Sequence, residues 1–439
     1  MVEASRDYKP IDLLATLGEP FKGELNDSPD AFQMVEAAKW TMRNVARRVV
    51  GRERLASQTL LALLTREHQL IFSRTGTAKS LYAETVFSQF TAETFSIQFT
   101  TGTTEEAVVG AYDLNKFREG TIWHNTEKSL VTADFAFLDE FMDANDMVLR
   151  SILGILNERK FSKGKQFEQA RLHSAIATTN YVRRSEMSEA VLDRFLFQAR
   201  INPETSPLDQ LLIDRVYSLQ NGRVSKPENP VPLDVLKELS KMVKGEGDTN
   251  ISASHSLLFL KNQLIKNYID MLFDQRREQN QNAEKLYISP RKLAKARDVL
   301  NASAILQGRF DASVEDLPAL RFILTTISGS EEDGDSEEEI FYQALDYTLT
   351  SFSREDLNDV EKIMFTYEYY EAYKDGKLVE AVKANLPGIF RIVMSLFGIV
   401  SWQDVNKEVF LQTLQAMKIK SPAVVQLRDN LKDKIIKYG

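Results

Sequence analysis

The chain has 439 residues, enough for roughly two or three domains, and its 43% apolar and 27% charged residues are typical of a globular protein. Its formal net charge of −8 argues against non-specific binding to DNA or to an anionic membrane surface. There is no cysteine, which excludes disulfides and thiolate metal sites, and no signal-peptide pattern or membrane-spanning stretch, so we expect a cytoplasmic protein.

The N-terminal part of the chain predicts a leader followed by two helices. Residues 1–35 are mixed and contain three prolines, which favours an irregular leader with a short helix near Ile11–Leu17. Apolar residues at helical spacing then predict a helix that ends near Val49, and a second amphipathic helix through Leu55–Leu64.

The next stretch has the order of a phosphate-binding P-loop. A strand candidate, Leu70–Phe72, leads through small residues into Lys79-Ser80 and a predicted helix, Leu81–Phe90. In such a loop backbone N–H groups cradle phosphates, the Lys adds a positive charge and the Ser hydroxyl binds Mg²⁺. Ser73 and Ala78 stand where the motif has glycines. From the loop alone, a chance Lys-Ser pair at the start of a helix is therefore an equally good explanation. The loop residues assigned to the nucleotide are Thr75, Gly76, Thr77, Ala78, Lys79 and Ser80.

Strand and helix patterns alternate up to Pro203. The further strand candidates are Thr94–Thr100, Ala133–Leu138, His173–Thr179 and Phe195–Ile201. We therefore predict an α/β domain with a mainly parallel sheet over residues 36–203. Within it, Met147–Glu158 reads as a helix, Thr101–Lys128 as irregular and Lys160–Arg171 as a hairpin.

The rest of the chain predicts helices only. We expect an all-α domain over residues 204–330 and a C-terminal helical domain over residues 340–439. The acidic run between them, residues 331–339, is typical of a solvated linker. The aromatic residues of the last domain are expected in its core, because basic residues do not interleave densely with them.

A second polar element follows the strand candidate Phe135–Leu138. Asp139 and Glu140 come at the C-terminal end of this buried strand, the edge at which open α/β sheets bind ligands. An Asp there can orient Mg²⁺ and its waters, and a Glu can polarise an attacking water. The alternative is a strand that simply ends in two solvated acids. It is disfavoured because Lys79-Ser80 follows an earlier strand of the same predicted sheet.

The order of these elements resembles that of the AAA+ ATPases, specifically the MoxR family and its RavA branch. Val50-Gly51-Arg52-Glu53 is similar to the family's box before its first helix. Gly76-Thr77-Ala78-Lys79-Ser80 is similar to its P-loop ending, Gly-x-Ala-Lys-Ser, so Ala78 follows the branch pattern. Phe137–Glu140 and Leu156–Phe161 resemble its Phe-Leu-Asp-Glu and Leu-Asn-Glu-Arg-x-Phe segments.

The resemblance spans Arg47–Arg309, with Ser73 as a departure from the family's first glycine. It implies a P-loop AAA+ core and an all-α lid domain at residues 204–330. ATP would be the nucleotide and Mg²⁺ the metal, with Ser80 and Asp139 as metal ligands. Val50 and Gly51 would contact the nucleotide.

The resemblance also implies three roles near the phosphates. Asn180, after the strand that follows Asp139-Glu140, would be the sensor 1 residue that holds the attacking water or the γ-phosphate, although an Asn at a strand end is also common in plain turns. Arg194 would be an arginine finger for the neighbouring subunit's nucleotide; a salt bridge with Asp193 or Glu189 is its alternative, and Arg183 and Arg184 are rival fingers. Arg291, in Ser289-Pro290-Arg291 at a helix start, would be sensor 2, unless it is an ordinary surface arginine.

The function that the resemblance implies is Mg²⁺-dependent ATP hydrolysis by a ring, expected as a homo-hexamer, that remodels or activates a protein client. A von Willebrand A-domain protein is the implied partner. Thr101–Lys128 and Lys160–Arg171 lie where the family has insertions that would face the pore or a partner. Two other classes stay open: a nucleic-acid-translocating motor, disfavoured by the acidic balance, and a slow nucleotide-binding scaffold, suggested by Ser73.

Overall fold

The computed structural model describes residues 11–18, 21, 23, 25, 29–181, 192–202, 206–220, 227–279, 285–324, 333–376 and 406–438. The chain forms two compact units. The first contains Met1–Ser252 and Leu286–Phe341, and the second contains Ala253–Lys285 and Tyr342–Gly439.

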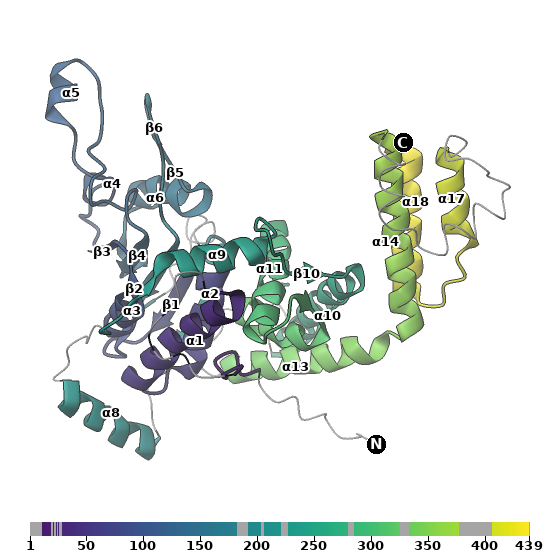
Figure 1. The fold of residues 1–439 in the computed structure, drawn as a ribbon, viewed down its shortest axis with the longest axis horizontal. Helices are drawn as coiled ribbons and strands as arrows, with labels where there is room; N and C mark the ends of the chain where they lie inside the picture. The colour runs from purple at the N-terminus through teal and green to yellow at the C-terminus, as the bar shows by residue number, and fades with distance from the viewer. Residues whose placement is uncertain are drawn as a thin grey trace. The chain divides into compact units, whose positions relative to one another are not determined.

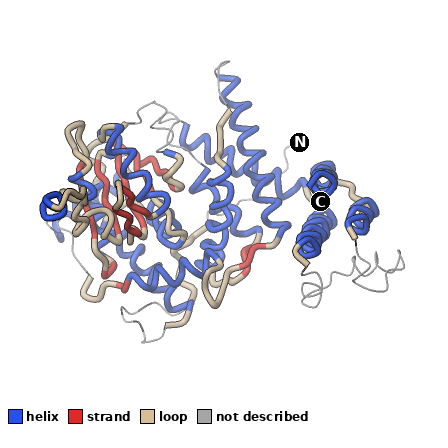
Figure 2. The backbone as a smooth tube through the Cα atoms, turned by 90° about the horizontal axis from the view of Figure 1, so that it is seen from above, coloured by secondary structure: helices blue, strands red, loops and turns tan. Residues whose placement is uncertain are grey.

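The first unit is built on a five-stranded sheet of order β3-β4-β7-β1-β8. Its strands are β1 (Gln69–Ser73), β3 (Thr94–Gln98), β4 (Phe135–Asp139), β7 (Ser174–Thr179) and β8 (Phe197–Ile201). Every neighbouring pair is parallel, so the strands all end at one edge, which we call the carboxyl edge; the other is the amino edge. All of β7 is buried, as expected for a sheet with helices around it (Figure 2). The predicted parallel α/β domain is confirmed.

Helices of this unit begin where side chains can cap them. Asp30 and Gln33 form a capping box at α1, Asn145 caps α6, and Ser289 caps α11 with Pro290 in its first turn. The helices are α1 (Ala31–Arg48), α2 (Glu53–Leu64), α3 (Lys79–Ser88), α4 (Glu106–Val109), α5 (Leu114–Arg118), η1 (Phe141–Asp143), α6 (Asp146–Glu158), α8 (Pro207–Gln220), α9 (Leu233–Lys244), α11 (Pro290–Leu306), η2 (Val314–Leu320) and α12 (Arg321–Leu324) (Figure 1).

The remaining strands are short. β5 (Lys160–Lys163) and β6 (Gln166–Gln169) pair in antiparallel register, which confirms the predicted hairpin. Two-residue strands also occur: β2 (Phe90–Thr91), β9 (Val231–Pro232), β10 (Ser252–Ala253) and β11 (Asp311–Ala312). The stretch Thr101–Lys128 holds α4 and α5, so it is less irregular than predicted.

The predicted leader helix at Ile11–Leu17 is wrong. Residues 11–18 form turns that lie on α1, where Leu17 N–H donates to Glu36 Oε1 at 2.9 Å and Lys39 Nζ donates to Ala15 O at 2.6 Å. The Asp12 carboxylate accepts from Leu14 N–H at 3.0 Å. These side chains satisfy the backbone groups that a helix would otherwise pair with one another.

The predicted acidic linker is also wrong in most of its length, because α13 spans Asp333–Ser351. Glu337 is buried, and Glu338 pairs with Arg321 at 3.3 Å and with Arg54. Acidic residues near a helix N-terminus are favourable, and ion pairs remove the reason for this run to stay solvated. The domain boundaries drawn from the sequence stay predictions, since the compact units divide the chain at other points.

The second unit is helical. It contains α10 (His255–Gln279), the later part of α13, α14 (Arg354–Lys374), α17 (Lys407–Ala416) and α18 (Pro422–Tyr438). Its core includes Ile363, Tyr370 and Phe410, and the last two rings meet edge to face at 5.5 Å. Aromatic residues therefore lie in this core as predicted. None of the helices that the structure describes is long and apolar enough to cross a membrane.

Candidate nucleotide-binding site

The loop between β1 and α3 lies at the carboxyl edge of the sheet. Gly76 has a φ of 85°, and Ala78 is in the left-handed region at φ 60°, immediately before α3 begins at Lys79. Glycine fits this region without strain, whereas an L-residue there costs roughly 1–2 kcal/mol. The loop therefore turns sharply before α3 begins, and Ala78 carries backbone strain.

Ser73 is the last residue of β1 and does not have a positive φ. Its hydroxyl lies 2.5 Å from Thr77 Oγ1, and Thr77 Oγ1 donates to Arg74 O at 3.0 Å. A glycine's conformational freedom is thus not required at Ser73, and its buried side chain ties the start of the loop to Thr77.

Lys79, Asn180 and Glu140 form one chain of hydrogen bonds. Lys79 Nζ donates to Ser73 O at 3.3 Å and to Asn180 Oδ1, and Asn180 Nδ2 donates to Glu140 Oε1. Burial lowers the pKa of Lys79, while the nearby carboxylates of Glu140 and Asp139 oppose this change. The structure brings together three residues that are far apart in sequence, as the sequence predicts.

Asp139 is held from three sides. Thr178 Oγ1 and Glu140 N–H donate to its Oδ1, the latter at 3.1 Å, and Ser80 Oγ donates to its Oδ2 at 3.4 Å. A serine hydroxyl and a carboxylate are the hard oxygen donors that Mg²⁺ prefers, so this pair fits the metal implied by the resemblance. Sequence reasoning missed Thr178; the signal for it was a polar residue near the end of a fully buried strand.

The turn Val50-Gly51 lies between α1 and α2. Gly51 has a φ of 71°, and buried Arg52 donates to Gly51 O at 2.9 Å. Burial raises the pKa of Tyr82 in α3, and the positive charge of Arg52 acts in the opposite direction. The charge of Arg52, next to this turn, therefore acts on the helix that begins with Lys79.

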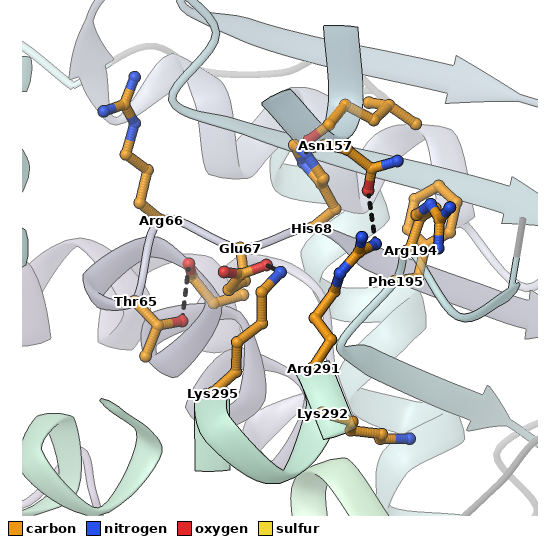
Figure 3. Close-up of polar contacts among 12 residues, drawn as sticks. Thr65, Arg66, Glu67, His68, Asn157, Arg194, Phe195, Arg291, Lys292 and Lys295 are labelled. Carbon is orange, nitrogen blue, oxygen red and sulfur yellow. Dashed lines mark hydrogen bonds and ion pairs between the residues drawn. The ribbon is translucent and has the colours of Figure 1, made fainter. Parts of the chain in front are cut away.

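Arg291, the predicted sensor 2, is not at this edge. α6 starts after Glu140 and runs back to the amino edge, where His68, next to the first residue of β1, lies 2.7 Å from Leu156 O. There Arg291 Nη1 donates to Asn157 Oδ1 at 3.3 Å (Figure 3). The five residues of β1, about 16 Å of strand, separate this edge from the P-loop.

Nearby contacts hold α11 in this position. Lys295, one helical turn beyond Arg291, pairs with Glu67 at 2.6 Å (Figure 3). Arg159 ends α6 and donates to Arg66 O at 2.9 Å and to His173 O at 3.3 Å, and burial lowers its pKa to about 10. Arg159 lies within the segment Leu156–Phe161, and the structure explains its presence as an anchor for the end of α6.

Arg194 lies at the amino edge as well. It comes just before β8, whose first residue, Phe197, is aligned with Gln69 at the start of β1. Its guanidinium pairs with Asp193 at 3.1 Å, the salt bridge considered as its alternative role. Lys292 of α11 is drawn near this segment in Figure 3. Burial lowers its pKa to about 8, and the negative charge of Asp193 opposes this change. Arg183 and Arg184 lie outside the described residues.

Replacing Ala78 by Gly should raise the free energy of unfolding by at most about 1.5 kcal/mol. Loss of the left-handed strain, roughly 1–2 kcal/mol, is partly offset by the greater freedom of glycine in the unfolded chain, roughly 0.5–1 kcal/mol. Urea denaturation measures the difference. The matched control is Ala46→Gly in α1, which should destabilise the protein by about 1 kcal/mol. A loss of stability in Ala78→Gly as large as in the control would contradict the assigned backbone strain.

Comparisons with known proteins agree with this architecture. Residues 36–240 match the family model of the MoxR domain in the MoxR-vWA-beta-propeller ternary systems, and residues 267–335 match an AAA lid domain. An uncharacterized protein of Methanocaldococcus jannaschii is 26% identical over 383 residues, which cover 86% of this chain and 88% of that protein.

Two further comparisons either cover less of the chain or have a lower sequence identity. Chaperone MoxR1 of Mycobacterium tuberculosis is 30% identical over 177 residues, 39% of this chain and 46% of that protein. A crystal structure from Cytophaga hutchinsonii, of a protein proposed to be an ATPase, aligns with a TM-score of 0.57 and 20% identity over 74% of this chain and 96% of that chain. At this identity the structural likeness supports the fold alone.

Proposed function

We propose that this chain, whose residues 36–240 match the family model of the MoxR domain, hydrolyses ATP with Mg²⁺ at the carboxyl edge of its sheet. The observation that carries the proposal is the continuous polar cluster of Ser80, Asp139, Glu140, Asn180 and Lys79. The cluster contains the Lys79 ammonium, which can bind phosphate, and the oxygens of Ser80 and Asp139, which can bind a metal. It also contains the Glu140 carboxylate, which can activate a water.

Each side chain then has a role that its position supports. The loop N–H groups and Lys79 bind the phosphates, and Ser80 and Asp139 hold the metal. Bound Mg²⁺ would neutralise charge on the phosphate oxygens. Glu140 accepts the proton of the attacking water, and Asn180, bonded to Glu140, orients that carboxylate. Val50 and Gly51 are proposed to contact the nucleotide beyond the phosphates.

Arg194 and Arg291 lie at the amino edge, where the strands begin. Their own P-loop lies at the opposite ends of the strands. We therefore propose that both act on the nucleotide of a neighbouring copy, where a guanidinium can neutralise transition-state charge. This differs from the usual idea of sensor 2, which touches the nucleotide of its own chain. Such a shared site requires an assembly, and a homo-hexameric ring of the RavA type is our expectation.

The proposed partners are proteins. The matching family model describes MoxR domains that work in systems with von Willebrand A-domain proteins, which supports a partner of that class and a chaperone-like action on a protein client. A cytoplasmic location is expected for such a system.

The backbone at Ser73 does not have the positive φ that would require a glycine, and this weakens the slow-scaffold alternative.

Phosphate release from ATP tests the proposal. We expect the purified protein to release phosphate only with Mg²⁺, and the Lys79→Ala variant to release none above background. Single-stranded DNA or RNA should not accelerate release, and a salt-dependent acceleration by either would favour the nucleic-acid motor. Nucleotide binding without any release by the wild-type protein would favour the scaffold.

A further inference from the structure

Ser73 ends β1 and stands where a P-loop usually has its first glycine. Its backbone is part of the sheet, because Ser73 is aligned with Ile201 of β8 in parallel register. Its side chain is buried at the point where the strand passes into the loop. A glycine here would lose this side chain and weaken the end of the strand. Ser73 thus connects a fixed strand to the loop that is proposed to bind phosphates.

The Ser73 side chain closes a small ring of hydrogen bonds across the loop. Its Oγ lies 2.5 Å from Thr77 Oγ1 and 3.2 Å from Arg74 O, and Thr77 Oγ1 lies 3.0 Å from the same carbonyl. Whichever hydroxyl donates to the other, the remaining hydroxyl hydrogen can reach Arg74 O, so both hydrogens have an acceptor. Ser73 is 1% exposed and Thr77 is 9% exposed, so water competes little for these bonds. We call the two hydroxyls and the Arg74 carbonyl the hydroxyl clasp.

The clasp spans the part of the loop with the most unusual backbone. Gly76 lies between Ser73 and Thr77 with φ 85°, and Ala78 follows with φ 60°. Residues 74–76 are exposed, so burial in the core does not order them. An exposed loop that contains glycine has many conformations to lose when it binds a ligand, and a link across it removes part of that freedom beforehand.

The loop leads directly into groups that already lie beside the rest of the proposed site. Ser80 Oγ lies 3.4 Å from Asp139 Oδ2, so the two proposed metal ligands are neighbours. Lys79 Nζ donates to Ser73 O at 3.3 Å, which ties its ammonium group to the residue that carries the clasp. The clasp therefore stabilises a loop whose proposed metal and phosphate ligands already lie together.

We propose that Ser73 is a positioning residue, which acts through Thr77 and holds the loop in its nucleotide-binding shape before the nucleotide arrives. The serine then favours binding instead of impairing it, because less conformational freedom is lost when the nucleotide binds. This inference rests on the proposed function, because it concerns the same ATP site. It predicts that the glycine usual in such a loop makes this protein a weaker nucleotide binder.

Titration of the full-length protein with a fluorescent ADP analogue and Mg²⁺ tests this inference. Ser73→Ala removes the hydroxyl and should weaken binding about 2–10-fold, the effect of one net hydrogen bond. Ser73→Gly should weaken binding further, because glycine also adds backbone freedom. The matched control is Ser254→Ala in the second unit, which removes a hydroxyl 3.0 Å from Ser256 Oγ and should leave ADP binding unchanged. Unchanged or tighter binding by Ser73→Gly would overturn the inference.

A double-mutant cycle shows whether the two hydroxyls act through one contact. Thr77→Val removes the second hydroxyl with little change of shape, whereas Thr77→Ser keeps it and should bind ADP more tightly than Thr77→Val. The protein with both Ser73→Ala and Thr77→Val should bind no more weakly than the weaker single variant, since each substitution already breaks the clasp. Effects that multiply in the double variant would show that the hydroxyls act separately, and would refute the clasp.

Two readouts separate positioning of the loop from a general loss of stability. In the nucleotide-free protein, amide hydrogen exchange over residues 74–78 should be about 3-fold faster or more in Ser73→Ala, with β7 exchanging as in the wild type. In steady-state ATP hydrolysis, KM should rise and kcat should change by a smaller factor, the pattern expected when ground-state binding is lost. Unchanged exchange in the loop, or a loss confined to kcat, would contradict the positioning role.

The ADP titration also distinguishes this inference from the proposed function. A wild-type protein that binds no ADP would refute both the ATP site and the role of Ser73. A wild-type protein that binds ADP, together with a Ser73→Gly protein that binds it equally well, would refute the role of Ser73 alone.

Discussion

Replacing Glu140 by Gln should lower the rate of ATP hydrolysis by about 10²–10⁴-fold while ATP still binds, because the amide cannot accept the proton of the attacking water. The substitution keeps the shape of the side chain, and its amide oxygen can still accept the hydrogen bond from Asn180 Nδ2. Lys79, Ser80 and Asp139 are untouched, so the phosphate and metal contacts remain.

A single-turnover experiment with radiolabelled ATP measures the chemical step, and a fluorescent nucleotide measures binding. Glu84→Gln is the matched control, because Glu84 is an exposed glutamate on α3 close in sequence to the P-loop. The control should hydrolyse ATP at the wild-type rate. A Glu140→Gln protein that hydrolyses ATP at that rate would show that another group activates the water.

Replacing Arg194 by Ala should lower hydrolysis by about 10³–10⁵-fold if the guanidinium acts as an arginine finger, again with little change in ATP binding. Removal of Arg194 breaks its ion pair with the half-buried Asp193 and takes no side chain from the P-loop edge. Arg291→Ala should have the same direction of effect, because Arg291 lies at the same amino edge.

Phosphate release and nucleotide binding are measured for both variants, with Arg150→Ala, an exposed arginine on α6, as the control. Normal hydrolysis by Arg194→Ala would remove it from the site and leave Arg183 or Arg184 as the finger. Loss of ATP binding together with hydrolysis in Arg291→Ala would instead indicate a contact with the nucleotide of its own chain.

Most of the sheet could be predicted from local signals. The buried apolar runs before Ser73 and Asp139 identify β1 and β4, and the parallel pairing brings their ends to one edge. We assigned Lys79, Asp139, Glu140 and Asn180 to the site because each lies at or after the end of a strand predicted from the sequence. Their grouping follows from the topology of a parallel sheet.

Other features depend on contacts that no local pattern contains. From Asp333 on, the acidic run is helical, and Glu338 in it pairs with Arg321 and Arg54, which are distant in sequence. Residues 11–18 form turns because the side chains of Glu36 and Lys39 make hydrogen bonds with backbone groups of this segment. A motif can mark Arg291 as a phosphate contact, but only the packing of α11 against Glu67 and Asn157 shows at which edge it lies.

The central claim is that one ATP site is shared by two copies of the chain, with Lys79 and Glu140 from one and Arg194 from the next. Phosphate release by complexes that contain both Lys79→Ala and Arg194→Ala chains, co-expressed with different tags and purified on both, tests it most directly. Each variant alone should be inactive, and the mixed complex should regain activity, because an intact P-loop then faces an intact Arg194. Mixed complexes as inactive as each variant alone, at every ratio of the two chains, would contradict the shared site.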